Sequence, residues 1–84
     1  MYAIILFRSL TYAQRGSRAL SLAGISSSVI KAPQGLTEKG CTYGVRLNET
    51  KLRRAVALLD GHGIDRGRAF LRSRLTGEYR EVPL

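Results

Sequence analysis

Few residues in this sequence of 84 amino acids are able to do covalent chemistry. It has one cysteine, Cys41, and one histidine, His62. A single cysteine cannot form an internal disulfide, and one cysteine with one distant histidine cannot complete a tetrahedral zinc site. The sequence therefore predicts no disulfide framework, no metal site and no cofactor, and it favours a reducing, cytoplasmic compartment. What it does offer is one thiol, whose ionised form is a strong nucleophile.

A general base for that thiol is harder to find. His62 follows a predicted helix, where capping the last carbonyl groups is a more common role than catalysis. Asp60 and Asp65 flank it, and turn or surface positions are the ordinary place for such residues. The residues alone therefore leave open whether the protein is an enzyme.

The charge of the chain permits several kinds of partner. Fourteen Lys and Arg residues against six Asp and Glu residues give a formal net charge of +8. Most of the cations are arginines, whose guanidinium groups bind phosphate and carboxylate well, so a nucleic acid, an acidic protein surface or a small anion would all fit. The longest apolar run, residues 2–7, is too short to span a membrane or form a signal peptide, and no membrane association is expected.

Length and hydrophobic pattern predict one domain over residues 1–84, with a core at about 2–74 and a polar C-terminal tail at 75–84. A hydrophobic content of 44% argues against disorder. Apolar runs and alternation predict strands, and the i, i+3, i+4 spacing predicts helices. The strands are expected at 2–7, 25–31, 42–47 and 69–74, and the helices at 10–23 and from 49 to about 60. This β-α-β-β-α-β order predicts a ferredoxin-like α/β (α+β) sandwich, in which both helices cover one face of an antiparallel sheet.

Residues with capping preferences stand at the predicted ends of the helices. Thr11 and Gln14 have the spacing of a capping box, although Ser9 could equally be the N-cap one turn earlier. Gly24 is placed to end the same helix. Asn48 is a suitable N-cap for the second helix.

This topology brings three chain junctions to one end of the sheet: Arg8 to Thr11, the loop that ends at Cys41, and His62 to Arg68. There Cys41 would lie near the start of the first helix, whose free N–H groups and dipole favour a thiolate. Arg8, Arg66 and Arg68 could add to that effect, and Gly40 would leave room beside the sulfur. These features predict an accessible thiol with a lowered pKa.

A simpler interpretation of the cysteine stays open. Cys41 has the same parity as Tyr43 and Val45 on the predicted strand, so its side chain could be a small hydrophobe buried under the sheet.

Several of these features together resemble a family of small bacterial proteins, the selenium/sulfur carrier-like family. The resemblance covers residues 2 to about 72. It rests on the first strand with Phe7-x-Ser9, the helix pattern Ala13…Leu20…Ala23-Gly24-Ile25, the loop with Pro33, Cys41 at its end, and Gly44-Val-Arg-Leu47. The sequence departs from the family pattern after the cysteine, where Thr42 and Tyr43 stand in place of an immediate glycine, and at Ser17, where an acidic residue is common.

The resemblance implies a function for Cys41. This residue would carry sulfur or selenium as a persulfide or selenosulfide and pass it from a donor protein to an acceptor protein, so the chain would be a carrier rather than a stand-alone enzyme. The predicted neighbourhood that would hold the anion comprises Arg8, Ser9, Thr11, Gly40, Arg66 and Arg68.

Two other classes of function compete with a carrier. An RNA-binding module would need aromatic residues on the open face of the central strands, and Tyr2 is the candidate there. A dimeric anion- or metabolite-binding regulator would use the glycine loops, which match neither a P-loop nor a dinucleotide fingerprint. An exposed edge strand makes a homodimer plausible.

Overall fold

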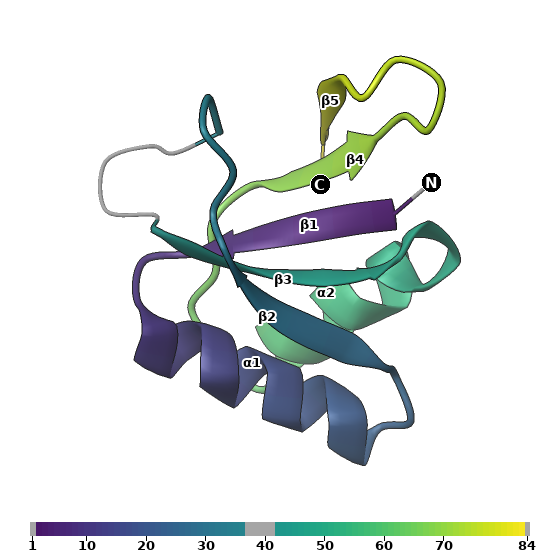
Figure 1. Ribbon diagram of the computed structural model, residues 1–84. Helices are drawn as coiled ribbons and strands as arrows, with labels where there is room; N and C mark the ends of the chain where they lie inside the picture. Colours follow the sequence, from purple (N-terminus) through teal and green to yellow (C-terminus); the bar gives the residue numbers. More distant parts are fainter. Residues whose placement is uncertain (1, 37–41, 84) are drawn as a thin grey trace.

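The computed structural model describes residues 2–36 and 42–83. The described residues form an α+β structure with one five-stranded sheet and two α-helices, and Figure 1 shows how these elements are arranged. All strand pairs are antiparallel, and the strand order is β2-β3-β1-β4-β5. The elements are β1 (Tyr2–Phe7), α1 (Leu10–Leu22), β2 (Ser27–Lys31), β3 (Tyr43–Asn48), the 3₁₀ turn η1 (Glu49–Lys51), α2 (Leu52–Gly61), β4 (Ala69–Arg72) and β5 (Tyr79–Val82).

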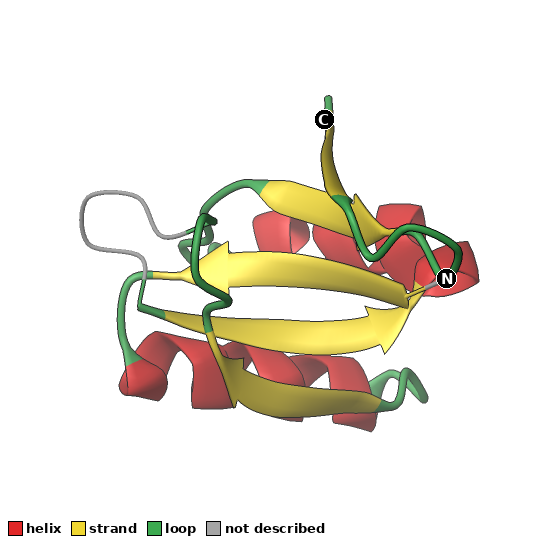
Figure 2. Cartoon of the chain, turned by 45° about the horizontal axis from the view of Figure 1, so that its top comes forward, coloured by secondary structure: helices red, strands yellow, loops and turns green. Residues whose placement is uncertain are grey.

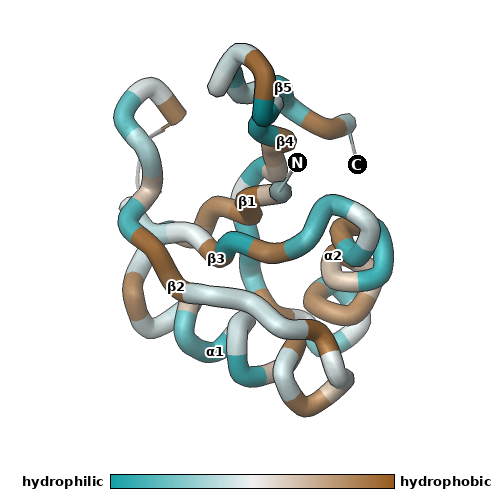
Figure 3. Tube along the Cα trace, turned by 45° about the vertical axis from the view of Figure 1, so that its right-hand side comes forward, coloured by the Kyte–Doolittle hydropathy of each residue, from teal (hydrophilic) through white to brown (hydrophobic). Residues whose placement is uncertain are grey.

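The central strand is β1. It pairs with β3 along its whole length, from Tyr2 opposite Asn48 to Phe7 opposite Tyr43, and with β4 on its other side. Its residues from Ala3 to Phe7 have no exposed surface. A run of apolar and β-branched residues suits such a position, because both faces of the strand are covered. Figure 3 shows this hydrophobic strand in the middle of the chain trace.

The sheet has two unequal hydrophobic sides. Both helices lie on one face (Figure 2), where alternate β1 residues, Ala3, Ile5 and Phe7, pack against apolar residues of α1 and α2. On the other face, Ile4 and Leu6 form a smaller cluster with Phe70. That smaller cluster is covered by Tyr2, Ile30, Ala32, Leu36 and Tyr79.

Of the two predicted N-caps for α1, the structure has Ser9. Its side-chain oxygen accepts a hydrogen bond from the Tyr12 N–H at 3.2 Å. Thr11 lies within the first turn, so a capping box starting at Thr11 is wrong. At the other end, Gly24 adopts a φ of 81°, and the N–H groups of Gly24 and Ile25 bond to the carbonyls of Ser21 and Leu20. These two bonds form a Schellman motif, which confirms the predicted stop at Gly24.

The second helix begins in two steps. Asn48, predicted to cap the second helix, instead caps the 3₁₀ turn η1 by accepting a hydrogen bond from the Thr50 N–H at 2.9 Å, and α2 then follows from Leu52. It ends in a second Schellman motif, in which Gly63 has a φ of 68° and the N–H of Ile64 bonds to the Leu59 carbonyl.

The fold differs from the predicted four-stranded sandwich by one strand. Residues 79–82, expected in a polar tail, pair with β4 as β5. A turn ending at Gly77, whose φ is 71°, reverses the chain, and Tyr79 and Val82 then pack on opposite sides of the sheet. Residues 79–82 include two charged side chains, and their alternation of polar and apolar residues is too short to predict a strand. The strand forms because its backbone pairs with β4.

The close contact between α1 and β1 generates a stability prediction. A Cβ added to Gly16 would lie 2.7 Å from Cζ of the buried Phe7 ring. We expect Gly16→Ala to destabilise the protein by about 1–3 kcal/mol, because overpacking outweighs the helix-propensity gain. Gly61→Ala is the matched control, since a Cβ there meets nothing within 4 Å. It should be neutral or stabilising. Urea unfolding measures both, and a Gly16→Ala protein as stable as the parent would contradict this packing.

Candidate functional site

The predicted meeting of chain junctions at one end of the sheet is present in the described residues. The N–H of Leu6 bonds to the Arg68 carbonyl at 2.9 Å, and the N–H of Gly67 bonds to the Leu6 carbonyl at 2.7 Å. From the other side, the Thr42 hydroxyl donates to the Arg8 carbonyl at 3.5 Å. The end of β1, the start of β3 and the approach to β4 therefore lie together.

The first turn of α1 opens onto this end of the sheet. Ser9 satisfies two backbone donors, because its side chain accepts from the Tyr12 N–H and its carbonyl from the Ala13 N–H. Thr11 is exposed in the same turn. The positive end of the helix dipole lies here, and it favours a negative charge placed close to it.

Arg8 directly precedes the N-cap residue of this helix, and its side chain already has partners. Its guanidinium lies 4.6 Å from the centroid of the Tyr12 ring and donates to the Tyr12 hydroxyl at 3.0 Å. It also pairs with the Asp65 carboxylate at 3.2 Å. The hydrogen bond to Tyr12, followed by the charge interactions with Tyr12 and Asp65, raises the pKa of Arg8. Its charge is thus permanent but partly offset by Asp65.

The other two predicted arginines also have acidic partners. Arg66 forms a two-pronged pair with Asp60, at 2.9 Å and 3.0 Å, and donates to the Gly67 carbonyl. Arg68 pairs with Glu81 of β5 at 2.7 Å. The side chains of Arg8, Arg66 and Arg68 therefore reach toward different carboxylates on three different segments.

Two of the predicted site residues, Gly40 and Cys41, lie outside the described residues. Their roles stay predictions. The described residue next to them in sequence is Thr42, whose hydroxyl donates to the Arg8 carbonyl.

His62 has the structural role expected of it. It is the C-cap residue of α2, and its backbone N–H bonds to the Leu58 carbonyl at 3.0 Å. Within residues 2–36 and 42–83, no group of three or more His, Cys, Asp or Glu residues could hold a metal ion. Neither helix in this part of the chain is both long enough and apolar enough to cross a membrane.

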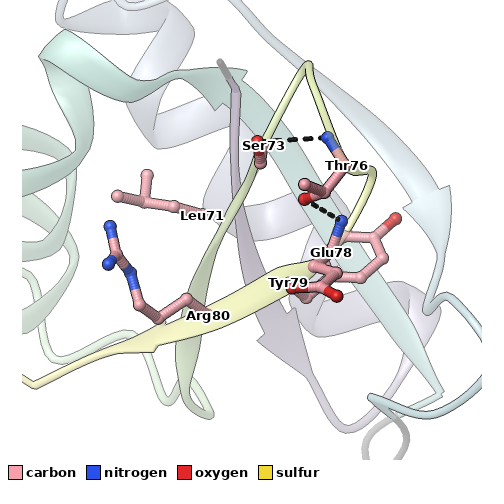
Figure 4. A pocket seen from close by; sticks show the side chains of 6 residues that line it. All are labelled: Leu71, Ser73, Thr76, Glu78, Tyr79 and Arg80. Atoms are coloured by element: carbon pink, nitrogen blue, oxygen red, sulfur yellow. Dashed lines mark hydrogen bonds between the residues drawn. The ribbon is translucent and has the colours of Figure 1, made fainter.

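A small pocket of about 220 Å³ lies at the turn between β4 and β5 (Figure 4). Its hydroxyl groups already serve the turn: Ser73 accepts from the Thr76 N–H, and Thr76 accepts from the Glu78 N–H. Leu71, Glu78, Tyr79 and Arg80 complete the lining. The hydroxyls of the pocket thus stabilise the turn between β4 and β5.

The sequence did not identify the partners of these arginines. Asp65 was assigned to a turn or the surface, and Tyr12 had no assigned role. Neither contact follows a helical or strand spacing that could have revealed it, except that Tyr12 lies one helical turn beyond Arg8.

Comparison with known proteins gives one result. The family model described as "Putative Se/S carrier protein-like" matches residues 2–68, which is most of the chain and includes Cys41. No curated protein and no solved structure gives a significant match.

The pair of Asp60 and Arg66 generates a prediction about pH. The hydrogen bond from Arg66 lowers the pKa of Asp60 below its ordinary value of 3.8. A carboxylate with a lowered pKa stabilises the fold above its ordinary pKa, and that contribution disappears as the pH falls through the folded value. We expect Arg66→Gln to raise the pKa of Asp60 toward 3.8, as measured by the carboxyl ¹³C shift against pH.

Arg68→Gln is the control for this titration, because Arg68 pairs with Glu81 instead of Asp60. It should leave the Asp60 curve unchanged. An Asp60 curve that is the same in the parent and in Arg66→Gln would show that the pair does not persist in solution.

Proposed function

Since the chain belongs to the "Putative Se/S carrier protein-like" family, we propose that it carries sulfur or selenium on Cys41 between two partner proteins. The observation that carries this proposal is that Cys41 is the one thiol of the chain and lies within the matched residues. The terminal sulfur or selenium atom would be held covalently, so the protein itself is the vehicle.

The transfer balances without an added oxidant. The Cys41 thiolate attacks the terminal sulfur of a donor persulfide, the donor S–S bond breaks, and the donor leaves as a thiolate. Cys41 then holds the sulfur as a persulfide with its proton. In the second step an acceptor nucleophile takes the terminal sulfur, and Cys41 is released as a thiolate. The same steps with selenium pass through a selenosulfide.

The described surroundings support such a thiolate. Cys41 is followed in the sequence by Thr42, the first described residue after it. Thr42 contacts the Arg8 carbonyl, and Ser9, the next residue, caps α1. A thiol near a helix N-terminus is ionised more readily than a free one.

The arginines contribute less than their number suggests. Arg8, Arg66 and Arg68 are each paired with a carboxylate, and these exposed pairs reduce the field that they exert on a nearby anion. We therefore assign the main stabilisation of the thiolate to the start of α1, and a smaller contribution to Arg8.

Sulfur loading tests this proposal. The protein is incubated with a cysteine desulfurase and L-cysteine, and its intact mass is measured. We expect a gain equal to one sulfur atom that dithiothreitol removes, because a persulfide is reducible. Cys41→Ser should gain nothing. No gain in the parent protein, or a gain that survives in Cys41→Ser, would refute the carrier role.

A relocated thiol tests whether the position matters. In the double variant Cys41→Ser/Ala57→Cys, the thiol is moved to an exposed position on α2. We expect loading of this variant to be slower by roughly threefold or more at neutral pH, because its thiolate fraction is that of an ordinary cysteine. Equal loading rates would mean that the environment of Cys41 has no special effect.

A further inference from the structure

A second group of arginines lies at the opposite end of the sheet, on the face that the helices leave uncovered. Arg46 is on β3, Arg72 is on β4, and Arg74 follows β4 directly. Tyr2 lies between them on the central strand: its ring centroid is 5.3 Å from the Arg46 guanidinium and 5.7 Å from that of Arg72. Arg72 also lies 5.8 Å from the ring of Tyr79 on β5. We call Tyr2, Arg46, Arg72, Arg74 and Tyr79 the open-face cluster.

The open-face cluster differs from the arginines at the other end in having no acidic partners. Within the described part of the chain, no ion pair joins Arg46, Arg72 or Arg74 to a carboxylate, whereas Arg8, Arg66 and Arg68 each have one. The carboxylate of Glu81, on the same face, is already paired with Arg68. The Nε of Arg72 is buried with no hydrogen-bond partner. Three like charges gathered without counterions favour the binding of an anion.

Beside these arginines the surface is hollowed. An open depression of about 560 Å³ is lined by Tyr2, Ser26, Ser28, Arg46, Asn48 and Arg74, among others. Asn48 uses its carbonyl oxygen to cap η1, which leaves its NH₂ group free to donate. Ser26 and Ser28 are exposed and add hydroxyl donors. Guanidinium, amide and hydroxyl donors around one hollow are the groups that bind phosphate oxygens.

We propose that the open-face cluster and this depression bind the phosphate backbone of single-stranded nucleic acid. Two features favour this ligand over an acidic peptide or a small anion. First, guanidinium planes alternate with the Tyr2 and Tyr79 rings, and bases stack on both kinds of surface, which a peptide carboxylate cannot exploit. Second, the depression is open rather than enclosed, which suits a chain that passes through it. The net charge of +8 adds a general attraction for polyanions.

This site uses none of the residues assigned to the carrier. It therefore stands independently of the transfer chemistry at Cys41, and Cys41→Ser should bind nucleic acid as the parent protein does.

Fluorescence anisotropy with a labelled twelve-residue oligouridylate tests the proposal. The double variant Arg46→Gln/Arg74→Gln removes two exposed arginines from the site. The control Arg18→Gln/Arg53→Gln removes the same charge from exposed positions on the two helices. At low salt we expect the site variant to bind about tenfold or more weakly, and the control to change by less than about threefold. Equal losses in the two variants, or no binding by the parent protein, would overturn the proposal.

The salt dependence of binding and the binding of other polyanions test the same proposal further. Three phosphate contacts predict that the logarithm of the association constant falls with the logarithm of the salt concentration with a slope of about −2. In Arg46→Gln/Arg74→Gln one contact remains, and the slope should be shallower, at about −0.7. An oligothymidylate of the same length should bind through the same arginines. Polyglutamate that binds as tightly, and with the same loss in the site variant, would assign this face to an acidic protein and refute the nucleic-acid site. Circular dichroism melts of both variants establish that each is folded.

Discussion

The burial of β1 on both faces is the constraint on which the rest of this structure depends. Five consecutive residues with no exposed surface need a cover on each side of the sheet. The helices provide one cover. The other is assembled from Tyr2, Phe70, Tyr79 and the segment that follows β2. Burying apolar surface on both sides is also what makes so short a chain stable, because a small domain buries a limited fraction of its surface.

Much of the fold could be predicted because the patterns that determine its strands and helix ends lie within short stretches of sequence. Alternation predicted the strands β3 and β4, and in the structure Val45 and Leu71 of these strands belong to the core between the sheet and the helices. Gly24 and Asn48 marked helix ends by their conformational and hydrogen-bonding preferences. The fifth strand could not be predicted in this way, because β5 gains its order from pairing with β4 and from contacts such as that of Tyr79 with the smaller cluster. Tertiary contacts of this kind leave no periodic pattern in four residues.

At the predicted site, too, the position of the chain segments could be predicted, but the contacts between distant side chains could not. Topology correctly brought Arg8, Ser9 and Arg68 to one end of the sheet, as the backbone contacts of Leu6 show. It could not reveal that Asp65 and Glu81 would take up two of the three arginine charges there. The parity of Arg46 and Arg72 was visible in the sequence, but their proximity to Tyr2 depends on which strands become neighbours. The arginines Arg8, Arg66 and Arg68 are thus each paired with a carboxylate, whereas within the described residues no ion pair joins Arg46, Arg72 or Arg74 to one.

The two proposed functions, transfer at Cys41 and nucleic-acid binding at the open-face cluster, thus involve different residues of the protein. In the proposed carrier, the start of α1 would favour the thiolate of Cys41, while Arg8 and Arg66 are each paired with a carboxylate. The central claim is that Cys41 is such a thiolate, and the rate of its alkylation by iodoacetamide against pH tests it most directly. We predict that the rate reaches half its maximum at a pH below that for free cysteine, because only the ionised thiol reacts. A midpoint at or above that of free cysteine would contradict the account.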